Sequence, residues 1–316
     1  MDANTFHDCD DLISVTIGKN VTTIRSEAFA ECNSLAKVKF GANVQEIGDE
    51  AFKGCTALKD LKLPSKLEKI GAQAFMNCIR ITSVALPSKV SYVGDKAFFG
   101  CTGLKKVTIN TEVLTTDNFG ADVFGGCTAL NKVTIAGEAV KIGEDAFAQV
   151  PDKAKFKITT KNKAAKDEII RNLLLYIDTF TDAKNNVYIL ITDETFEAYL
   201  TGTNDAAAKS IKVPDAVTYR GLAIPVIGIQ ESAFKDNTAI TTVTIGKNVR
   251  TIDNQAFEGC SNLKTVTIKS KNLILIGYKA FYGNSPAATY KISDKTKLAA
   301  YKQLLIDAGV EAAKIK

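Results

Sequence analysis

The residues best able to do chemistry in this sequence are its seven cysteines. Thiols form disulfides, bind metals or act as nucleophiles, and each role requires a characteristic spacing or partner. Each cysteine stands three residues after a phenylalanine, and the first five recur every 23 residues; the set is Cys9, Cys32, Cys55, Cys78, Cys101, Cys127 and Cys260. This spacing matches no zinc pattern. We therefore predict a ladder of buried thiols that pack as small apolar side chains, with disulfides or a metal site as the alternatives.

Asparagine takes the cysteine position in two places. Asn237 and Asn284 stand three residues after Phe234 and Phe281, and Val150 fills the position once. An amide is small and, like a thiol, can donate a hydrogen bond to a backbone carbonyl of a turn. We therefore expect Asn237 and Asn284 to continue the structural ladder and to donate to the turn in the same way.

Residues typical of enzyme active sites are scarce. The sequence has one histidine, His7, which lies beside Phe6 and Cys9 in a first, partial repeat. A Ser-His or Cys-His pair could use only this histidine, which we interpret as a surface residue. The sequence also has no GxxxxGK[ST], HExxH or GxGxxG phrase. We predict a protein that is not an enzyme, with no catalytic residue, no metal site and no cofactor.

The repeated phenylalanines indicate which elements position the cysteines. They occur in the phrase AFxxC or close variants of it, at Phe6, Phe29, Phe52, Phe75, Phe98, Phe124, Phe147, Phe234, Phe257 and Phe281. A fixed period in the low twenties is typical of a solenoid of stacked coils. In one coil, Ala28–Cys32 is predicted to form a short helical turn, and Val38–Phe40 alternates apolar and polar residues as a strand does. We predict parallel strands stacked about 4.8 Å apart.

Two helical segments divide the repeats into arrays. Lys163–Ile177 and Lys297–Gly309 have apolar residues at helical spacing, and they follow the predicted strands Phe156–Ile158 and Tyr290–Ile292. A terminal helix can cover the last coil of a solenoid. We therefore predict an array of about seven coils with a C-terminal cap helix in residues 1–177, and a second array of about three coils with its own cap helix in residues 178–316.

The two arrays start differently. The second has a β-rich N-terminal cap before its coils, predicted from Val187–Ile191, Phe196–Leu200, Ala207–Pro214, Ala216–Arg220 and Ile224–Ile227. The first begins part-way through a coil, so we expect its start to be truncated. It also has extra residues at Thr115–Gly120, which we interpret as a bulged loop that is either a tolerated insertion or part of a binding rim.

One coil carries a family resemblance over its whole length. Ile47–Pro64 reads IGDEAFKGCTALKDLKLP and is similar to the pattern IGxxAFxxCxxLxxVxIP of the BspA-like leucine-rich repeat family. Val217–Gly221 and Val226–Gly228 also resemble the starts of arrays in that family. The resemblance implies a leucine-rich-repeat solenoid that is secreted or exposed on the surface of a host-associated microbe. It also implies adhesion, binding of host matrix proteins and co-aggregation, and it supplies no catalytic motif.

The outward positions of the predicted strands carry mainly lysine and threonine. In Val-x-Ile the middle residue faces away from the core, and so does the residue before the valine. The candidate binding residues at these positions are Lys37, Lys39, Lys62, Lys106, Thr108, Lys132, Thr134, Lys155 and Lys157. In the second array the corresponding residues are Thr242, Thr244, Thr265 and Thr267. A lysine stripe attracts acidic partners; the alternative is that these residues only keep an exposed sheet soluble.

Composition limits the class of partner. The net charge of +5 is a mild basic excess, unlike the strong basic patch of a nucleic-acid-binding protein, and no run of 18 apolar residues predicts a membrane span. We predict a secreted or cell-surface adhesion protein, its signal peptide removed, that binds a protein or glycan, host extracellular matrix included, through the strand face. The alternative is a structural spacer whose binding segments lie outside this chain.

Overall fold

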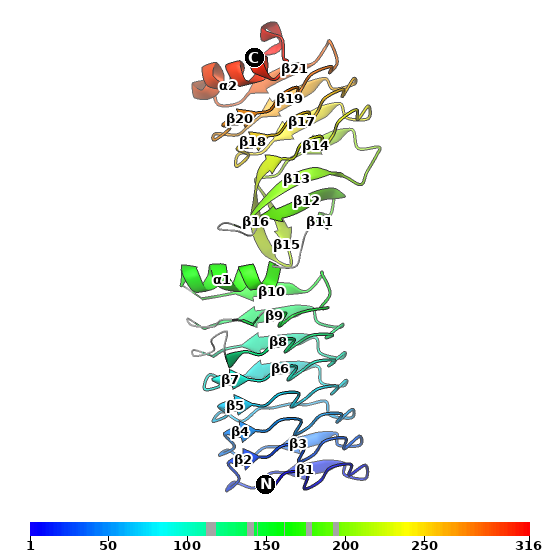
Figure 1. The fold of residues 1–316 in the computed structure, drawn as a ribbon, viewed down its shortest axis with the longest axis vertical. Helices are drawn as coiled ribbons and strands as arrows, with labels where there is room; N and C mark the ends of the chain where they lie inside the picture. Colours follow the sequence, from blue (N-terminus) through cyan, green and yellow to red (C-terminus); the bar gives the residue numbers. More distant parts are fainter. Residues whose placement is uncertain (112–117, 138–141, 144, 161, 175–178, 192–195) are drawn as a thin grey trace. The chain divides into compact units, whose positions relative to one another are not determined.

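The computed structural model describes residues 1–316 except 112–117, 138–141, 144, 161, 175–178 and 192–195 (Figure 1). The chain forms two compact units, Met1–Leu175 with Arg220–Leu222 and Tyr176–Tyr219 with Ala223–Lys316. The predicted boundary between residues 177 and 178 lies outside the described residues. In each unit parallel strands of successive coils pair with one another, which is the predicted leucine-rich-repeat solenoid.

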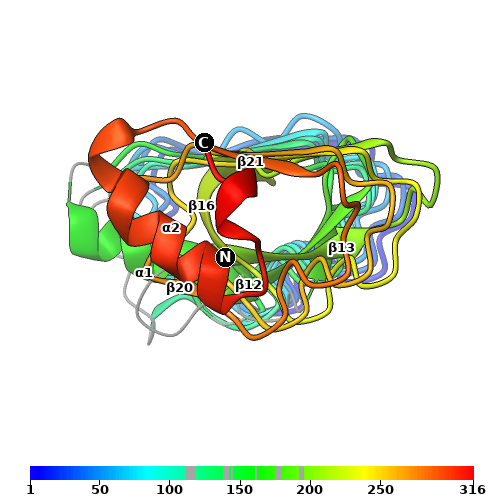
Figure 2. The same cartoon turned by 90° about the horizontal axis from the view of Figure 1, so that it is seen from above.

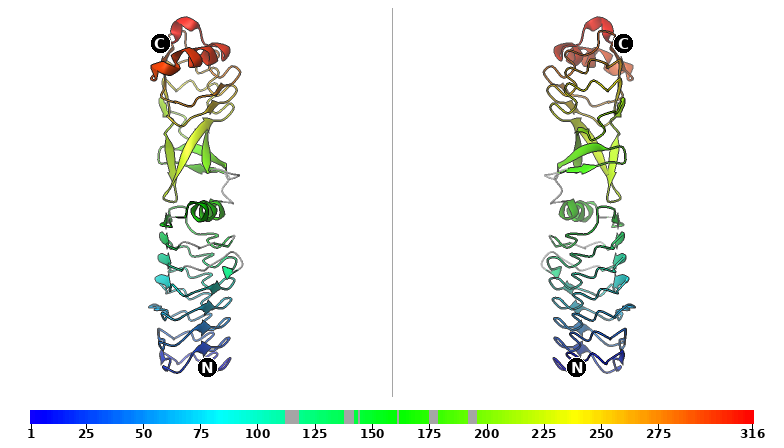
Figure 3. Two further views of the ribbon diagram at one scale, coloured as in Figure 1. Left: turned by 90° about the vertical axis from the view of Figure 1, so that its left-hand side faces the viewer. Right: turned by 90° about the vertical axis from the view of Figure 1, so that its right-hand side faces the viewer.

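The first unit has one row of longer strands and one row of shorter strands. The longer strands are β1 (Ser14–Thr16), β3 (Lys37–Lys39), β6 (Ser83–Leu86), β8 (Lys106–Ile109), β9 (Lys132–Ile135) and β10 (Lys155–Ile158). The shorter strands are β2 (Thr23–Ile24), β4 (Glu46–Ile47), β5 (Lys69–Ile70) and β7 (Tyr92–Val93). Helix α1 (Lys163–Leu174) follows β10. Figure 3 shows the longer strands stacked along one side of this unit.

The AFxxC phrase forms hydrogen-bonded turns that point phenylalanine inward. The N–H of Cys55 donates to the carbonyl of Phe52 at 3.3 Å, and the N–H of Phe52 donates to the carbonyl of Ala74 in the next coil at 2.8 Å. The rings then stack: the ring centroid of Phe52 lies 5.1 Å from that of Phe29 and 5.3 Å from that of Phe75. The stack runs from Phe6 to Phe147 in the first unit, and a second stack runs from Phe234 to Phe281.

The paired rows differ from the prediction in two respects. The row of shorter strands was not predicted. The predicted strand around Lys62 does not form, so the longer strands are divided into two sheets, one of β1 and β3 and the other of β6, β8, β9 and β10. Leu61 is buried and Lys62 is exposed, so the side chains alternate there without ladder hydrogen bonding. Of the predicted loop Thr115–Gly120, residues 115–117 lie outside the described residues, while Phe119 is buried and bridges to Val93.

The second unit begins with a β-rich segment. Its strands are β11 (Thr179–Thr181), β12 (Asn186–Ile191), β13 (Glu197–Thr203), β14 (Ser210–Lys212), β15 (Ala216–Tyr219) and β16 (Leu222–Ile229). The coils add β17 (Thr242–Ile245), β18 (Thr251–Ile252), β19 (Thr265–Ile268), β20 (Leu275–Ile276) and β21 (Thr289–Ile292). One sheet has the order β11-β12-β13-β16-β18-β20, with β15 paired to β16, and the other has the order β14-β17-β19-β21. The sheet that contains β16 therefore extends from the coils into the β-rich segment, whereas the sheet that contains β17 ends at β14.

A helix covers the end of the second unit. The 3-10 helix η2 (Lys295–Lys297) leads into α2 (Leu298–Asp307), and η3 (Ala312–Lys314) follows. Helix α2 lies beside β20 at the end of the stack (Figure 2). It buries Tyr301 and Leu305, and the Tyr301 hydroxyl accepts a hydrogen bond from the N–H of Leu273 at 3.0 Å. In the first unit, α1 buries Ile169, Leu173 and Leu174.

Candidate binding surfaces

The outward side chains of β8, β9 and β10 form rows across the strands. Parallel pairing places Lys106 beside Lys132 and Lys132 beside Lys155. The three lysines are exposed, and the valines and phenylalanine between the outward positions are buried. Because neighbouring strands lie about 4.8 Å apart, this lysine row, defined as Lys106, Lys132 and Lys155, spans only about 10 Å. A second row contains Thr108, Thr134 and Lys157.

The remaining predicted face residues lie apart from these rows. Parallel pairing of β1 with β3 places Lys37 beside Ser14 and Lys39 beside Thr16. Lys62 is exposed but lies outside the strands. On β6 the outward residues are Ser83 and Ala85, which carry no charge. The structure thus brings together the candidates on β8, β9 and β10 and separates the three others from them.

The candidate lysines have no carboxylate within ion-pair distance in the part of the chain that the structure describes. Among the described residues, none of Lys37, Lys39, Lys62, Lys106, Lys132, Lys155 and Lys157 forms an ion pair. The row of shorter strands differs: Nζ of Lys69 lies 2.9 Å from Oε1 of Glu46, and this hydrogen bond raises the pKa of Lys69. The positive charge of the lysine row is therefore available to an external anion.

The cysteines form an internal ladder. All seven are free thiols, and six of them donate from Sγ to the carbonyl of a phenylalanine in the preceding coil, as Cys55 does to Phe29 at 3.1 Å. Burial raises the pKa of Cys127 to about 12 and that of Cys260 to about 11. The thiolate is the nucleophile and the metal ligand. Cys127 and Cys260 are therefore protonated and unreactive at neutral pH.

The asparagines at the cysteine position accept hydrogen bonds from backbone N–H groups, and Nδ2 of Asn284 also donates to the hydroxyl of Tyr290 at 3.4 Å. Oδ1 of Asn237 accepts from the N–H groups of Ala239 and Ile240 at 3.0 and 3.2 Å. Oδ1 of Asn284 accepts from the N–H of Cys260 at 2.9 Å. The expectation that both amides donate to turn carbonyls was therefore wrong. An amide offers an acceptor as well as donors, and the neighbouring backbone here supplies N–H groups.

The histidine of the sequence, in the first coil, lies beside two carboxylates. His7 is partly exposed, with Nδ1 3.1 Å from Asp8 and Nε2 3.5 Å from Glu27. Within the described part of the chain, no group of three or more His, Cys, Asp or Glu residues is placed to hold a metal ion. A search of the same residues finds no helix with the length and apolar character that membrane crossing requires.

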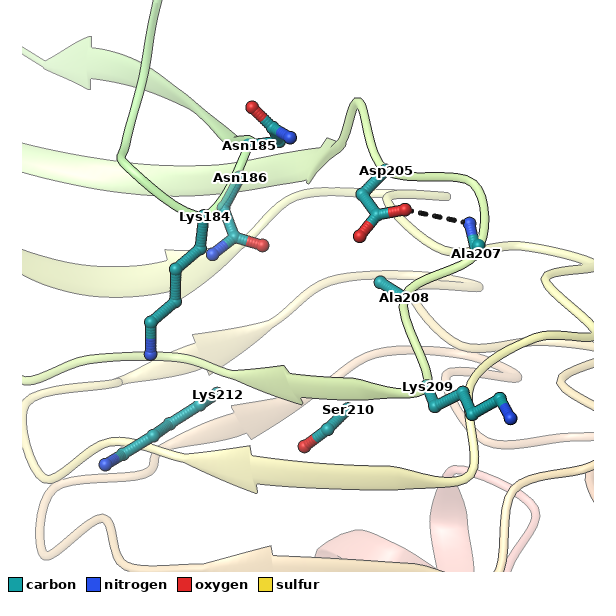
Figure 4. A pocket seen from close by; sticks show the side chains of 9 residues that line it. All are labelled: Lys184, Asn185, Asn186, Asp205, Ala207, Ala208, Lys209, Ser210 and Lys212. Carbon is teal, nitrogen blue, oxygen red and sulfur yellow. Dashed lines mark hydrogen bonds between the residues drawn. The ribbon is translucent and has the colours of Figure 1, made fainter.

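A polar hollow in the second unit was missed by the sequence analysis. It has a volume of about 610 Å³ and lies between β14 and the turn that leads into β12 (Figure 4). Residues from three segments line it, among them Lys184, Asn186, Asp205, Lys209, Ser210 and Lys212. Ser210 and Lys212 occupy the outward strand positions of the repeat, in register with Thr242 and Thr244. Lys184, Asn186 and Asp205 precede that strand, and their proximity to it depends on one sheet ending at β14. The composition of the β-rich segment does not indicate the hollow, because residues 179–229 contain only three lysines against six acidic residues.

A second missed feature is an apolar patch on the last coil of the second unit. The side chains of Ile274, Leu275, Tyr278 and Tyr282 are all exposed, Ile274 by 71% and Tyr278 by 66%. Nζ of Lys279 lies 5.3 Å from the ring centroid of Tyr278 and 5.2 Å from that of Tyr282. Lys279 is thus within cation–π distance of both rings.

Comparison with known proteins identifies one family. The model of the BspA type leucine rich repeat region matches residues 1–119, 114–182 and 208–302, with 6 copies. No curated protein matches the sequence.

Several solved structures are similar to the chain. A leucine-rich repeat protein from Bacteroides ovatus is 21% identical over 100% of this chain and 86% of its own, with a TM-score of 0.44. A leucine rich cell surface protein from Faecalibacterium prausnitzii is 20% identical over 89% of this chain and 72% of its own, with a TM-score of 0.32. The pneumococcal vaccine antigen PcpA is 16% identical over 89% of this chain and 62% of its own, with a TM-score of 0.32.

Proposed function

The chain belongs to the BspA-type leucine-rich repeat family, and from that premise we propose that it is a non-catalytic adhesion protein of the cell surface or extracellular space. Its partner is an acidic protein or an acidic glycan. The contact is made by the exposed strand face of the first unit, centred on the lysine row of Lys106, Lys132 and Lys155.

The unpaired lysine row is the observation that carries this proposal. Like charges placed directly opposite each other on neighbouring strands destabilise a sheet. The row places Lys132 between two other lysines, and no carboxylate of the described residues lies within ion-pair distance of it. A surface that needed only to be soluble could mix charges of both signs. Three ammonium groups within about 10 Å instead favour a partner that brings several negative charges.

The geometry favours a partner with spaced charges over one with a single carboxylate. A lysine ammonium is a point charge on a flexible stem, without the fork of arginine that binds one carboxylate in two places. The solenoid repeats that charge at each strand. An acidic segment or a chain of acidic sugars can lie across the strands and contact the row at several points.

Charge reversal of the row tests the proposal. The triple variant Lys106→Glu, Lys132→Glu and Lys155→Glu is compared with a matched triple variant, Lys89→Glu, Lys163→Glu and Lys166→Glu, whose lysines are exposed elsewhere in the same unit. Both are screened against immobilised matrix proteins and sulfated glycans at low and high salt. We expect the first variant alone to lose about tenfold or more in affinity, and wild-type binding to weaken with salt.

Two results would oppose the proposal. If a ligand binds both triple variants as tightly as the wild type, the lysine row is not the site. If the wild type binds no ligand of the screen, the result favours the alternative that the chain is a structural spacer. The second unit favours that alternative to some degree, because the outward rows of β17 and β19 pair Thr242 with Thr265 and Thr244 with Thr267 and carry no charge.

A further inference from the structure

Strand β14 presents an unpaired edge to the hollow of the second unit. Its sheet has the order β14-β17-β19-β21, so among the described strands β14 has a neighbour on one side only. The opposite sheet of the same unit continues past its first coil through β16 and β13 to β12 and β11. The β-rich segment therefore extends one wall of the solenoid and leaves the other wall open beside β14.

The backbone of β14 has hydrogen-bonding groups on the open side. In a parallel ladder, alternate residues turn their N–H and C=O groups to the same neighbour. The carbonyl of Lys209 accepts from Thr241 at 2.8 Å, and the N–H of Val213 donates to Thr244 at 2.9 Å. The intervening residues, Ser210 and Lys212, therefore turn their backbone groups to the open side, where the structure pairs β14 with no other strand.

The hollow beside this edge has room for a short segment of chain. Its volume of about 610 Å³ falls within the range of ligand sites in proteins, roughly 300 to 1,000 Å³. Ser210 and Lys212 line it, whereas Ile211, whose side chain is buried, does not. A smaller cavity of about 340 Å³ shares Lys184 and Lys212 and reaches Pro214, so the open space continues past the end of β14.

The charge around the hollow is mainly positive. Figure 4 shows Lys184 and Lys212 extending to one end of the hollow and Lys209 to the other. Asp205 is the only acidic residue of the lining, and its Oδ1 already accepts the N–H of Ala207 at 3.0 Å. Within the described part of the chain, none of the three lysines forms an ion pair.

We propose that β14 accepts an extended, acidic peptide segment of a partner protein as an additional strand, with carboxylates of the segment contacting Lys184, Lys209 and Lys212. Exposed backbone donors and acceptors of a sheet edge fit another backbone, which favours a peptide over a sugar or a simple anion. Lysines at an edge also oppose pairing with neutral or basic strands, so the same residues select for acidic ones. This site is separate from the lysine row of the first unit.

The first experiment tests the charge requirement. A fluorescein-labelled peptide of alternating glutamate and valine is titrated with the full chain, and binding is followed by fluorescence anisotropy. We expect saturable binding that falls about tenfold in the triple variant Lys184→Glu, Lys209→Glu and Lys212→Glu. The matched control is Lys264→Glu, Lys269→Glu and Lys291→Glu, three exposed lysines of the same unit outside the hollow, and it keeps wild-type affinity. The Lys106, Lys132 and Lys155 triple variant also keeps it.

The second experiment tests strand addition itself. The same peptide with every backbone nitrogen methylated keeps its charges but lacks backbone donors, so we expect it to bind poorly. Hydrogen exchange of the Ser210 and Lys212 amides slows when the unmodified peptide is bound. The proposal is overturned if the wild type does not bind the peptide, if the methylated peptide binds equally well, or if binding leaves both amides unprotected. Displacement by a sulfated oligosaccharide without amide protection would point to simple charge attraction, and it also overturns the proposal.

Discussion

At the scale of single residues, the first unit holds an arrangement that folding alone does not favour. Lys132 has a lysine in register on each side, Lys106 on β8 and Lys155 on β10. The corresponding position on β6 is Ser83, which shows that the coil also accepts a neutral residue there. Lysine is thus not required by packing, and its repetition on three successive strands is what the proposed binding of an acidic partner would explain.

Replacing the central lysine is expected to stabilise the protein. Lys132→Thr removes two in-register repulsions and introduces a residue with higher strand propensity. We expect the free energy of unfolding to rise by about 0.5 kcal/mol at low salt, and by less at high salt because the repulsion is screened. Lys291→Thr is the matched control, since Lys291 lies in register with Thr267 rather than with another lysine. Urea unfolding at two salt concentrations measures both variants; an equal gain in the two would contradict the repulsion.

The buried thiols are expected to make the free energy of unfolding fall as the pH rises above 9. Burial raises the pKa of Cys127 from its usual 9.0 to about 12 in the folded protein. The folded state therefore holds this proton more tightly than the unfolded state, so the contribution is fully present below pH 9 and is lost as the pH rises towards 12.

The variant Cys127→Ala removes this dependence at one position. Between pH 9 and 11, we expect wild-type stability to fall more steeply than that of the variant, by up to about 1.4 kcal/mol per pH unit. Urea unfolding across this range gives the comparison, and Cys9→Ala, which removes a half-exposed thiol of the first coil, serves as the control. Parallel pH profiles for wild type and Cys127→Ala would show that the thiol does not ionise on unfolding.

At the scale of the coil, the phenylalanine stack is the main apolar element. Phe75 is fully buried and stacks on Phe52 and Phe98, whereas Phe6 is half-buried and stacks on Phe29 alone. Phe75→Ala leaves a cavity between two rings, and we expect a loss of about 3 to 5 kcal/mol. Phe6→Ala is expected to cost less than half as much. Denaturant unfolding measures both; equal losses would mean that the stack contributes no more than ordinary burial.

Two glycines of neighbouring coils are expected to differ in their tolerance of alanine. A Cβ on Gly71 would lie 2.5 Å from the main-chain nitrogen of Asp49, so two coils would have to separate. Gly54 has φ of +73°, but a Cβ there would meet only the carboxylate end of Glu31, which is flexible. We expect Gly71→Ala to cost about 3 kcal/mol and Gly54→Ala about 1 kcal/mol. Thermal unfolding tests the order, which is the decisive result.

Sequence reasoning succeeded where the repeat itself carries the signal. Phe52 and Cys55 recur with their coil, so their stacking and burial follow from the period. Strands of two residues such as β5 are too short to show alternation, and the alternation at Leu61–Leu63 looks like that of a true strand although none forms. The hydrogen bond that Asn284 accepts depends on the N–H of Cys260 in the preceding coil, which the repeat pattern does not reveal. The hollow depends on β13 pairing with β16 rather than with β14, a choice between distant segments that no local pattern records.

At the scale of the whole molecule, the two units have different binding features. The first has unpaired lysines in register on a sheet face, and the second has an open sheet edge with lysines around it. A charged sheet face can bind either a protein or a glycan, because it contacts the partner through charge. A sheet edge binds through backbone hydrogen bonds and therefore requires a peptide. Each unit also has its own phenylalanine stack, Phe6 to Phe147 and Phe234 to Phe281. Each unit therefore has its own phenylalanine stack and its own proposed binding site.

We expect the two units to unfold independently, because in solenoids each coil contacts mainly the coils beside it. Phe75→Ala is expected to speed hydrogen exchange in the first unit and to leave the second unchanged, while Phe257→Ala, in the middle of the second stack, does the reverse. Exchange followed by mass spectrometry on peptides from both units measures this in the intact chain. Faster exchange in both units for either substitution would instead show that the two stacks unfold as one cooperative structure. In that case the lysine row and the β14 edge would not be thermodynamically independent sites, and a ligand bound at one would stabilise the other.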